Sequence, residues 1–513
     1  MLKKILSNKP INFYNYVFLF SFLNLILYHL PFYKFIFSHI NNHSFNGILL
    51  IASVSITSII LNALFFYIIL YLFHKFGKIL LAILFIINAI AFYFINTYGI
   101  IIDESMIGNV FNTKYEEASS FWSFGLLLYI LFLGILPGLL LFKMQFSRIK
   151  IKKFLKDVII GLVFILVIIF INSSNWLWID KNSKTLGGLV MPWSYIVNIN
   201  RYFIHKSQEN KEQIQLPDAQ IKDHQKSVVV LVIGESARRN NFSLYGYPKN
   251  TNPLLSKISN LHHYDAEACA TYTTAGVKCI LEHKPTGKLY EILPNYLYRN
   301  GVDVVWRTTN WGEPTVKIKK YLKRQDLQKI CDGEDCKYDG ILLAGLKKQI
   351  LNSNKDKILI VLHTSTSHGP SYYKKYPKRF EKFSPVCKSV ELAQCSREEL
   401  INAYDNTIVY TDYILASLIK QLKELKGYHA AMIFVSDHGE SLGENNLYMH
   451  GIPKSIAPEE QYEIPFIAWA SDDSKSFRNI HKTINQHYVF HSILDFLGID
   501  SPIFNKKLSI FKN

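Results

Sequence analysis

The chain has 513 residues and a formal net charge of +17 at pH 7, a length that predicts about three domains. Residues 1–172 are dominated by Phe, Ile, Leu and Tyr, whereas the sequence after about residue 205 is typical of a soluble α/β domain. A membrane-embedded half places its Lys and Arg in cytoplasmic loops near anionic lipid. The basic excess therefore does not indicate nucleic-acid binding, and we expect no nucleic-acid partner.

Apolar segments in the N-terminal half predict five membrane-spanning helices. Their approximate ranges are 13–30, 47–73, 79–95, 124–142 and 158–171. The first is long for a signal peptide and lacks a clear cleavage site, so we expect a retained anchor. The last is shorter than the ~20 residues of a span, and we expect flanking apolar residues to extend it into the interfaces.

Basic clusters at 3–9, 74–78 and 143–156 lie before the first segment, between the second and third, and between the fourth and fifth. By the positive-inside rule these three regions are cytoplasmic. Five spans then place the C-terminal half on the outer side of the membrane.

Two further segments have patterns that suit a membrane surface. Asn109, Thr113 and Glu117 recur every four residues, which places them on one face of a helix. Lipid-headgroup contacts and a solvated helix both agree with this spacing. Residues 191–204 mix Trp, Tyr and Phe with Asn and Arg, which predicts an interfacial helix, and polar residues 206–225 are typical of a linker.

All six cysteines lie in the second half, in three sequence-local pairs without C-x-x-C spacing, which weakens a zinc-ribbon or thioredoxin interpretation. They are Cys269 and Cys279, Cys331 and Cys336, Cys387 and Cys395. Local pairing is the simplest of the possible connectivities. Disulfides persist in oxidising compartments, so this half is expected in the periplasm or outside the cell; reduced cytosolic thiols are the alternative.

Two apolar strands end in acidic residues. The run 228–233 leads through Gly234 to Glu235, and the run 431–435 leads to Asp437 and His438. Such runs are typical of central parallel strands, which present ligands beyond their C-terminal ends. Two carboxylates and one imidazole form a ligand set that suits Zn²⁺.

The segment between Cys269 and Cys279 is rich in small and hydroxylated residues and then resembles the first turn of a helix. A helix N-terminus favours a phosphate, and a hydroxyl beside a metal can ionise and attack phosphorus. An ordinary N-cap threonine is the alternative interpretation.

Runs at 302–306 and 358–362 predict further strands, and His368 and His450 lie in glycine-bounded loops after strands. These histidines suit a second metal or a phosphate, and ordinary loop histidines are the alternative. Strands that alternate with helical segments predict a mostly parallel sheet with helices on both faces.

Taken together, the motifs IGESARR, the Cys–Thr–Cys segment, HGP at 368–370, INAYDN at 401–406, SDHGESLGEN at 436–445 and the His450–Gly451 pair resemble the membrane-bound phosphoethanolamine transferases. This family modifies lipid A and includes the mobile colistin-resistance proteins. The resemblance covers nearly the whole chain. It implies a five-helix transmembrane domain (1–172), an interfacial helix and linker (173–226) and a periplasmic α/β domain (227–513) with the alkaline phosphatase–sulfatase fold.

The resemblance implies that Glu235, Thr273, Asp437 and His438 hold a catalytic Zn²⁺, with Thr273 as the nucleophile. His368 and His450 match family histidines linked to substrate or to a second zinc. Further positions match substrate contacts: Asn109, Thr113, Glu117, Thr271, Asn310, Lys317 and Glu440. Many relatives carry Lys four residues after the asparagine, where this chain has Pro314 with Lys317 nearby, so acceptor binding is expected to differ.

The resemblance also implies a reaction and its partners. Phosphoethanolamine would pass from phosphatidylethanolamine to Thr273 and then to lipid A or another envelope acceptor, giving resistance to cationic peptides such as polymyxin. We expect a monomer in the inner membrane of a bacterium. The alternatives are a glycerol-phosphate transferase of the lipoteichoic acid synthase type, a sulfatase- or phosphatase-type hydrolase, and a membrane-anchored binding protein with structural zinc residues.

Overall fold

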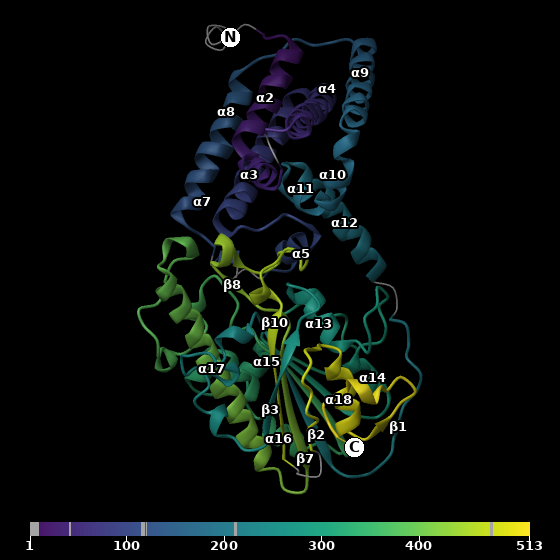
Figure 1. Ribbon diagram of the computed structural model, residues 1–513, viewed down its shortest axis with the longest axis vertical. Coiled ribbons are helices and arrows are strands. Elements are labelled where there is room, and N and C mark those ends of the chain that lie inside the picture. The colour runs from purple at the N-terminus through teal and green to yellow at the C-terminus, as the bar shows by residue number, and fades with distance from the viewer. Residues whose placement is uncertain are drawn as a thin grey trace. The chain divides into compact units, whose positions relative to one another are not determined.

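In the computed structural model, residues 10–40, 43–113, 118–119, 121–209, 213–471 and 476–512 are described. The chain divides into two compact units (Figure 1). The first comprises Met1–Thr113 and Trp122–Lys206, and the second comprises Lys114–Phe121 and Ser207–Asn513. Each unit is considered by itself below.

Long apolar helices build the first unit. Among the described residues, three helices are long and apolar enough to cross a membrane, namely α4 (Phe45–Tyr98), the continuous segment Phe124–Lys143 and α9 (Ile151–Ile171). The segment Phe124–Lys143 consists of α7 (Phe124–Tyr129), the π-helical turn η1 (Ile130–Ile135) and α8 (Leu136–Lys143). Helices α2 (Phe13–Tyr28) and α3 (Leu30–His39) form a fourth candidate span that bends by 63°. The sequence did not predict α3.

Helix α4 contains two of the expected spans. A straight helix of its 54 residues would be roughly 80 Å long, far more than the ~30 Å of a bilayer core. Instead, His74 has non-helical backbone angles, and a Cβ on Gly77 would lie 2.8 Å from the carbonyl oxygen of Ile69. Such an approach requires the chain to reverse within the predicted basic loop, so the described helices accommodate the five expected spans.

Shorter helices follow in this unit: α5 (Glu104–Asn112), α10 (Trp176–Lys181), α11 (Ser183–Leu189) and α12 (Trp193–Glu209). The predicted interfacial helix corresponds to α12, and buried amides join it to the spans. The hydroxyl of Tyr195 donates to Asn88 (2.8 Å), Asn88 donates to Asn24 (2.7 Å), and Asn24 donates to the carbonyl of Met191 (3.0 Å). Satisfied polar networks of this kind fix a single packing arrangement.

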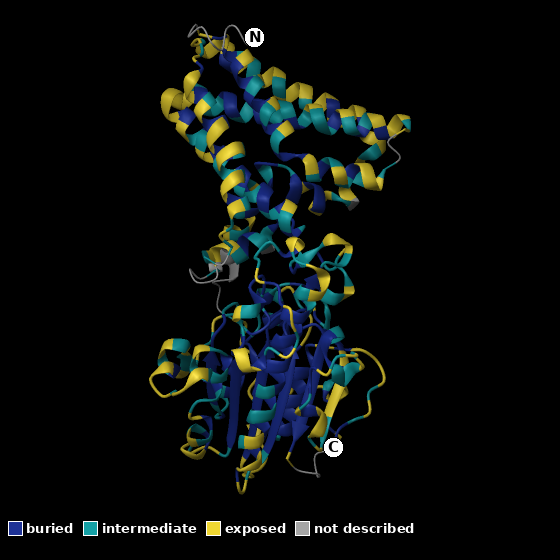
Figure 2. Cartoon of the chain, turned by 90° about the vertical axis from the view of Figure 1, so that its left-hand side faces the viewer, coloured by how far each residue is buried: buried dark blue, intermediate teal, exposed yellow. Residues whose placement is uncertain are grey.

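The second unit is built on an eight-stranded mixed sheet with the order β11-β3-β10-β7-β2-β6-β4-β5. Its strands are β2 (Ser227–Gly234), β3 (Leu261–Glu267), β4 (Asp303–Thr308), β5 (Lys320–Lys323), β6 (Lys357–His363), β7 (His429–Ser436), β10 (Glu463–Ala470) and β11 (Ile484–Asn485). Strands β7, β2, β6, β4 and β5 are parallel, whereas β10 is antiparallel to both of its neighbours. Figure 2 shows the buried centre of this sheet, to which β2 and β7 belong.

Helices cover the sheet on both faces, as the alternating pattern predicts. They are α13 (Thr273–Leu281), α14 (Leu293–Arg299), α15 (Arg324–Gln328), α16 (Leu346–Leu351), α17 (Arg397–Lys423) and α18 (Tyr488–Phe496). Val229, Leu231 and Ile233 of β2 share one core with residues of α13, α14 and α18, and α17 lies on the opposite side of the strands (Figure 1). Two small antiparallel strand pairs complete the unit: β1 (Gln220–Ile221) with β12 (Ile499–Asp500), and β8 (Ser441–Leu442) with β9 (Tyr448–Met449).

All three predicted local cysteine pairs are disulfides in the structure. They join Cys269 to Cys279, Cys331 to Cys336 and Cys387 to Cys395. The first of them closes the segment that contains Thr273.

Replacing both Cys269 and Cys279 by serine is expected to destabilise the second unit. A loop of this length, with a sequence separation of 10, loses about 2.5 kcal/mol of stabilisation when its closure is removed. Urea unfolding of the double variant measures the loss. The matched control is the Cys331→Ser/Cys336→Ser variant, whose sequence separation of 5 closes a shorter loop, so its removal should cost less stability. An equal or larger loss in the control would contradict the loop-length argument.

Candidate active site

The two predicted strand–acid junctions are neighbours in the sheet. Strands β2 and β7 are adjacent and parallel, with Gly234 paired to Ser436, so Glu235 and Asp437 emerge at the same level. The backbone N–H of Asp437 donates to the carbonyl of Gly234 (2.9 Å), and that of Ser236 donates to Oδ1 of Asp437 (3.1 Å). The junctions are therefore hydrogen-bonded to each other as well as paired.

Four predicted zinc ligands converge at this edge. Nε2 of His438 lies 3.4 Å from Oε1 of Glu235 and 3.5 Å from Oδ2 of Asp437. Oγ1 of Thr273 lies 3.3 Å from the same nitrogen and 3.5 Å from both carboxylate oxygens of Glu235. Two atoms bound to one tetrahedral zinc at about 2.0 Å lie roughly 3.3 Å apart, so this set of donors fits a single Zn²⁺.

The buried carboxylates of Glu235 and Asp437 point to a cation in the same place. Oδ2 of Asp437 is buried without a hydrogen-bond partner among the described residues. Burial and the neighbouring charge of Glu235 raise the pKa of Asp437 to about 7. Burial of Glu235 opposes its ionisation. The hydrogen bond and the charge of His438 outweigh burial and hold the pKa of Glu235 well below the usual range. Two adjacent buried carboxylates need a positive charge between them.

The charge of His438 fits the same interpretation. Burial opposes its protonation, yet Asp437 and Glu235 outweigh burial and raise its pKa to about 10. Either a proton on the imidazole or a divalent cation supplies the required charge, and a metal displaces such a proton when it binds. Nδ1 of His438 faces the carbonyl of Gly439 at 2.8 Å, which leaves Nε2 for a metal.

Polar neighbours orient Glu235. Nδ2 of Asn310 donates to Oε2 (2.5 Å), and the hydroxyl of Ser236 donates to Oε1 (2.8 Å). Asn310 also donates to the carbonyl of Thr364 (2.8 Å). The side chain predicted to contact substrate thus contacts the predicted ligand Glu235, as partners that fix metal ligands commonly do.

Thr273 is the first residue of α13, and its side chain is buried between two close neighbours. A Cβ on Gly276 would lie 2.2 Å from the carbonyl oxygen of Asp437, so only glycine lets the first turn of α13 pack against the loop after β7. On the other side, Gly312 approaches the methyl group of Thr273. These contacts direct the hydroxyl of Thr273 toward Glu235 and His438.

Replacing Gly312 by alanine is expected to reduce transfer more than stability. Its φ of +107° is unfavourable for a side chain, and a Cβ would lie 3.1 Å from Cγ2 of Thr273. We expect a loss of about 1 kcal/mol of stability and roughly a 10²-fold loss of turnover, because the displaced group is the predicted nucleophile. Gly246 is the matched control, since its φ is +92° and a Cβ there would meet no atom within 4 Å; equal losses of turnover in both variants would contradict the steric argument.

The predicted histidines form a second group beside the first. The ring centroids of His450 and His438 are 4.3 Å apart, and those of His450 and His368 are 5.3 Å apart. Nδ1 of His450 lies 2.7 Å from Oε2 of Glu440, whose other oxygen accepts from the hydroxyl of Tyr372 (2.5 Å). Burial and the nearby charge of His438 lower the pKa of His450. Imidazoles in this position suit a phosphate or a second metal.

Of the other residues predicted to contact substrate, Thr271 is buried and Lys317 is exposed. The hydroxyl of Thr271 donates to the carbonyl of Ile452 (2.5 Å), so it holds the His450 loop. Lys317 is exposed, and its backbone N–H donates to Oδ1 of Asn295 (2.6 Å).

Within the first unit, α5 ends at Asn112, and both the N–H (2.8 Å) and the hydroxyl (2.6 Å) of Thr113 donate to the carbonyl of Asn109. Glu117, the third member of the predicted stripe, lies outside the described residues.

Sequence reasoning missed a buried carboxylate that joins two loops of the site. Asp339 accepts from the hydroxyl of Thr309 (2.7 Å), the N–H of Ser365 (2.6 Å) and the hydroxyl of Thr366 (2.6 Å). These partners follow β4 and β6, whose loops carry Asn310 and His368. Asp339 lies in a short helical turn without a recognisable motif, so no local pattern indicated it.

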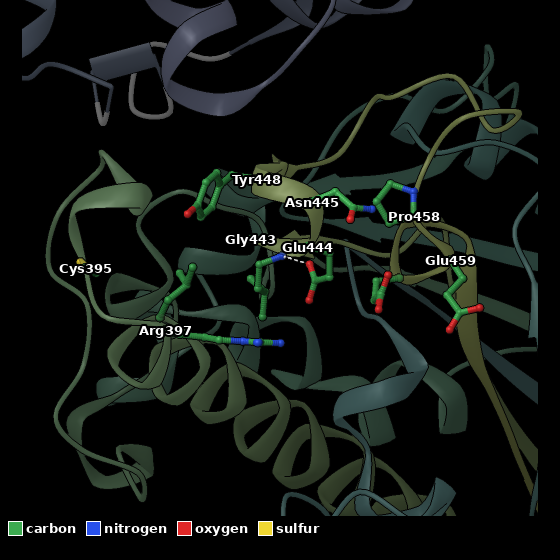
Figure 3. A pocket seen from close by; sticks show the side chains of 11 residues that line it. Cys395, Arg397, Gly443, Glu444, Asn445, Tyr448, Pro458 and Glu459 are labelled. Carbon is green, nitrogen blue, oxygen red and sulfur yellow. Dashed lines mark hydrogen bonds between the residues drawn. The ribbon is translucent and has the colours of Figure 1, made fainter. Parts of the chain in front are cut away.

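A cavity of about 590 Å³ lies beside the site, between the start of α17 and the β8–β9 pair (Figure 3). Its lining includes Arg397, Glu444, Tyr448 and Glu459. None of the predicted zinc ligands lines it. The ion pair of Glu444 with Arg238 (2.8 Å) connects its wall to the loop after β2.

Comparisons with known proteins agree with this arrangement. Residues 227–499 match the sulfatase family, which defines the class of the second unit, and residues 59–207 match the family described as phosphoethanolamine transferase EptA/EptB. EptA of Helicobacter pylori is 40% identical over 517 residues, covering 98% of each chain. Mcr-1 of Escherichia coli, a phosphatidylethanolamine transferase, is 32% identical over 426 residues, covering 76% of this chain and 78% of its own. The chain belongs to the phosphoethanolamine transferase family.

Solved structures share the fold. The integral membrane phosphoethanolamine transferase EptA of Neisseria meningitidis superposes with a TM-score of 0.85 at 24% identity, over 98% of this chain and 99% of its own. The periplasmic domain of EptC from Campylobacter jejuni has a TM-score of 0.52 at 35% identity, over 58% of this chain and 97% of its own. The predicted fold class, a membrane-embedded helical unit followed by a sulfatase-type α/β unit, is confirmed.

Proposed function

We propose that this phosphoethanolamine transferase moves phosphoethanolamine from phosphatidylethanolamine to lipid A or a related envelope acceptor, through an intermediate on Thr273. The observation that carries the proposal is the convergence of Thr273 Oγ1 with Glu235, Asp437 and His438 at zinc-ligand spacing. A Kdo(2)-lipid A phosphoethanolamine 7''-transferase of Escherichia coli is 28% identical over 53% of this chain, which supports the acceptor class.

Glu235, Thr273, Asp437 and His438 would hold one Zn²⁺, which when bound lowers the pKa of the threonine hydroxyl and neutralises phosphoryl charge. In the first step Oγ1 of Thr273 attacks phosphorus, the phosphorus–oxygen bond to diacylglycerol breaks, and a phosphoethanolamine ester of Thr273 forms. The hydroxyl of Thr273 loses its proton in this step, and the diacylglycerol oxygen gains one. Burial of Thr273 at the start of α13 excludes bulk water from this exchange.

In the second step a phosphate or hydroxyl oxygen of the acceptor attacks the same phosphorus and releases Thr273. His368 and His450 lie next to this centre and would position the phosphoryl oxygens or transfer the proton. When the acceptor oxygen belongs to a phosphate, the added ammonium group leaves the product with less net negative charge. Weaker binding of cationic peptides such as polymyxin follows.

We propose that the protein is a multi-pass protein of the bacterial inner membrane, with the second unit in the periplasm. Three disulfides and the charges of the predicted loops support this location. We further propose that the protein acts as a monomer with one catalytic zinc and that the second histidine group can hold another.

A labelled-donor assay tests the proposed function. Detergent-purified protein is incubated with lipid A and either phosphatidylethanolamine labelled in ethanolamine or phosphatidylglycerol labelled in its glycerol headgroup. We expect labelled lipid A from the first donor and none from the second. Transfer from phosphatidylglycerol alone would establish a glycerol-phosphate transferase, and release of free phosphoethanolamine without labelled lipid A would establish a hydrolase; either result overturns the proposal.

A further inference from the structure

Gln486 joins the segment that carries the predicted ligands Asp437 and His438 to the segment that carries Thr273. It lies between β11 and α18 and is fully buried. Its Nε2 donates to the carbonyls of Ser436 (2.9 Å) and Asp437 (2.7 Å), and its Oε1 accepts from the N–H of Cys269 (2.9 Å). Two carbonyls and one N–H fix the orientation of the amide, because the reversed amide would face each partner with the wrong group.

The next residue contacts the other end of the nucleophile segment. Nε2 of His487 lies 3.2 Å from Sγ of Cys279 and 3.8 Å from Sγ of Cys269. Its Nδ1 lies 3.2 Å from the carbonyl oxygen of Glu282, which follows the end of α13. Gln486 and His487 therefore contact both the beginning and the end of the disulfide-closed segment that presents Thr273.

We propose that Gln486 is a positioning residue for phosphoryl transfer, which sets the position of Thr273 relative to Asp437 and His438. Thr273 and His438 come from segments that lie 165 residues apart in the sequence. Gln486 fixes both backbones with one short side chain. A displacement of about 1 Å at a reacting group can cost roughly 10² in rate, so this amide controls turnover without touching substrate. The rate effect rests on the proposed function.

The direct test is Gln486→Glu in the full-length, zinc-loaded protein. The variant retains an acceptor for the N–H of Cys269 but turns a carboxylate oxygen toward the carbonyls of Ser436 and Asp437. We expect kcat for transfer to fall roughly 10²-fold with KM changed less than about threefold. We also expect zinc affinity, measured by titration of metal-free protein, to fall roughly 10- to 100-fold, as for other partners of metal ligands.

Asn406→Asp is the matched control. Asn406 is also fully buried, and it accepts from the N–H groups of Lys382 (2.8 Å) and Phe383 (2.9 Å) and donates to the carbonyl of Phe383 (2.8 Å). It therefore holds backbone in the same way but does not contact the predicted ligands. The control should lose thermal stability while kcat and zinc affinity stay within about threefold of wild type.

Gln486→Met, which keeps the volume and removes all three hydrogen bonds, decides the question if the glutamate variant does not fold. Wild-type kcat and zinc affinity in Gln486→Met would overturn the proposal, and so would equal losses of kcat in Asn406→Asp. If the wild-type protein transfers no phosphoethanolamine, the proposed function fails, whereas the zinc titration of the variants still tests the role of Gln486.

Discussion

Alanine at position 273 is expected to abolish phosphoethanolamine transfer, with a loss of at least roughly 10⁴-fold in turnover. Oγ1 of Thr273 is the hydroxyl that lies within 3.5 Å of Glu235 and His438, and alanine removes it without disturbing their mutual contacts. The fold should persist, because the lost hydroxyl group is small. Metal-free and zinc-loaded variants should still differ in thermal stability, since three ligands remain.

The control for this variant is Thr274→Ala, which removes the adjacent hydroxyl from the same helical turn. It should retain transfer within about tenfold of wild type. Thr273→Ser should keep partial activity, because it preserves the hydroxyl but loses the methyl group that packs against Gly312. Substantial transfer by Thr273→Ala, measured with the labelled donor, would refute the nucleophile assignment.

Asparagine in place of Asp437 is expected to remove a zinc ligand while leaving the loop hydrogen bonds intact. Oδ1 accepts from the N–H groups of Ser236 (3.1 Å) and His438 (2.7 Å), and an asparagine oxygen can continue to accept both. Only Oδ2, which has no hydrogen-bond partner among the described residues, is replaced. We expect zinc affinity to fall by more than about 10²-fold, because removing a residue that only hydrogen-bonds a metal ligand already costs up to about 10²-fold. Transfer should fall together with zinc affinity.

Asp437→Asn should not lower the thermal stability of the metal-free protein at alkaline pH, although it lowers zinc affinity. The raised pKa of Asp437, about 7, means that its carboxyl stabilises the metal-free fold below the unfolded pKa of about 4 and that this contribution is lost as the pH rises through 7. At pH 8 the metal-free variant should therefore melt no lower than the metal-free wild type. Zinc at 100 times the Kd of the wild type should stabilise the wild type by about 2.7 kcal/mol. The same zinc concentration should stabilise the variant far less.

Asp412→Asn is the matched control for a buried carboxylate outside the site. Both oxygens of Asp412 accept backbone N–H groups, from Leu254 (2.9 Å) and Leu255 (3.0 Å). This control should lower stability with or without zinc and leave zinc affinity unchanged. Unchanged zinc affinity in Asp437→Asn would contradict its place in the ligand set.

Local sequence patterns predicted the parts of this protein that depend on local physics. A run of apolar residues followed by an acid places Glu235 and Asp437 at strand ends, whatever the remainder of the fold. The length of the apolar segments predicted the membrane spans, and the short sequence separation of the paired cysteines predicted the disulfides. The resemblance then added Thr273, which an isolated hydroxyl pattern could not distinguish from a helix cap.

Contacts between distant segments could not be predicted in the same way. Gln486 and Asp339 act on loops that follow other strands, so their roles depend on strand order and register, which no single stretch encodes. The positive φ of Gly312 and its approach to Thr273 likewise follow from how the loop after β4 meets α13. The hydrogen bond from Asn310, which the sequence predicted to contact substrate, to Glu235 was also not predictable, because it arises where the loop after β4 brings the amide beside that carboxylate.

Peptide-level mass analysis tests the central claim most directly. Zinc-loaded protein in detergent is incubated with phosphatidylethanolamine without acceptor and then digested. The account predicts one added phosphoethanolamine on the peptide that contains Thr273, and its loss when lipid A is supplied. A glycerol-phosphate adduct formed from phosphatidylglycerol, or a phosphoethanolamine adduct on a different residue, would contradict it.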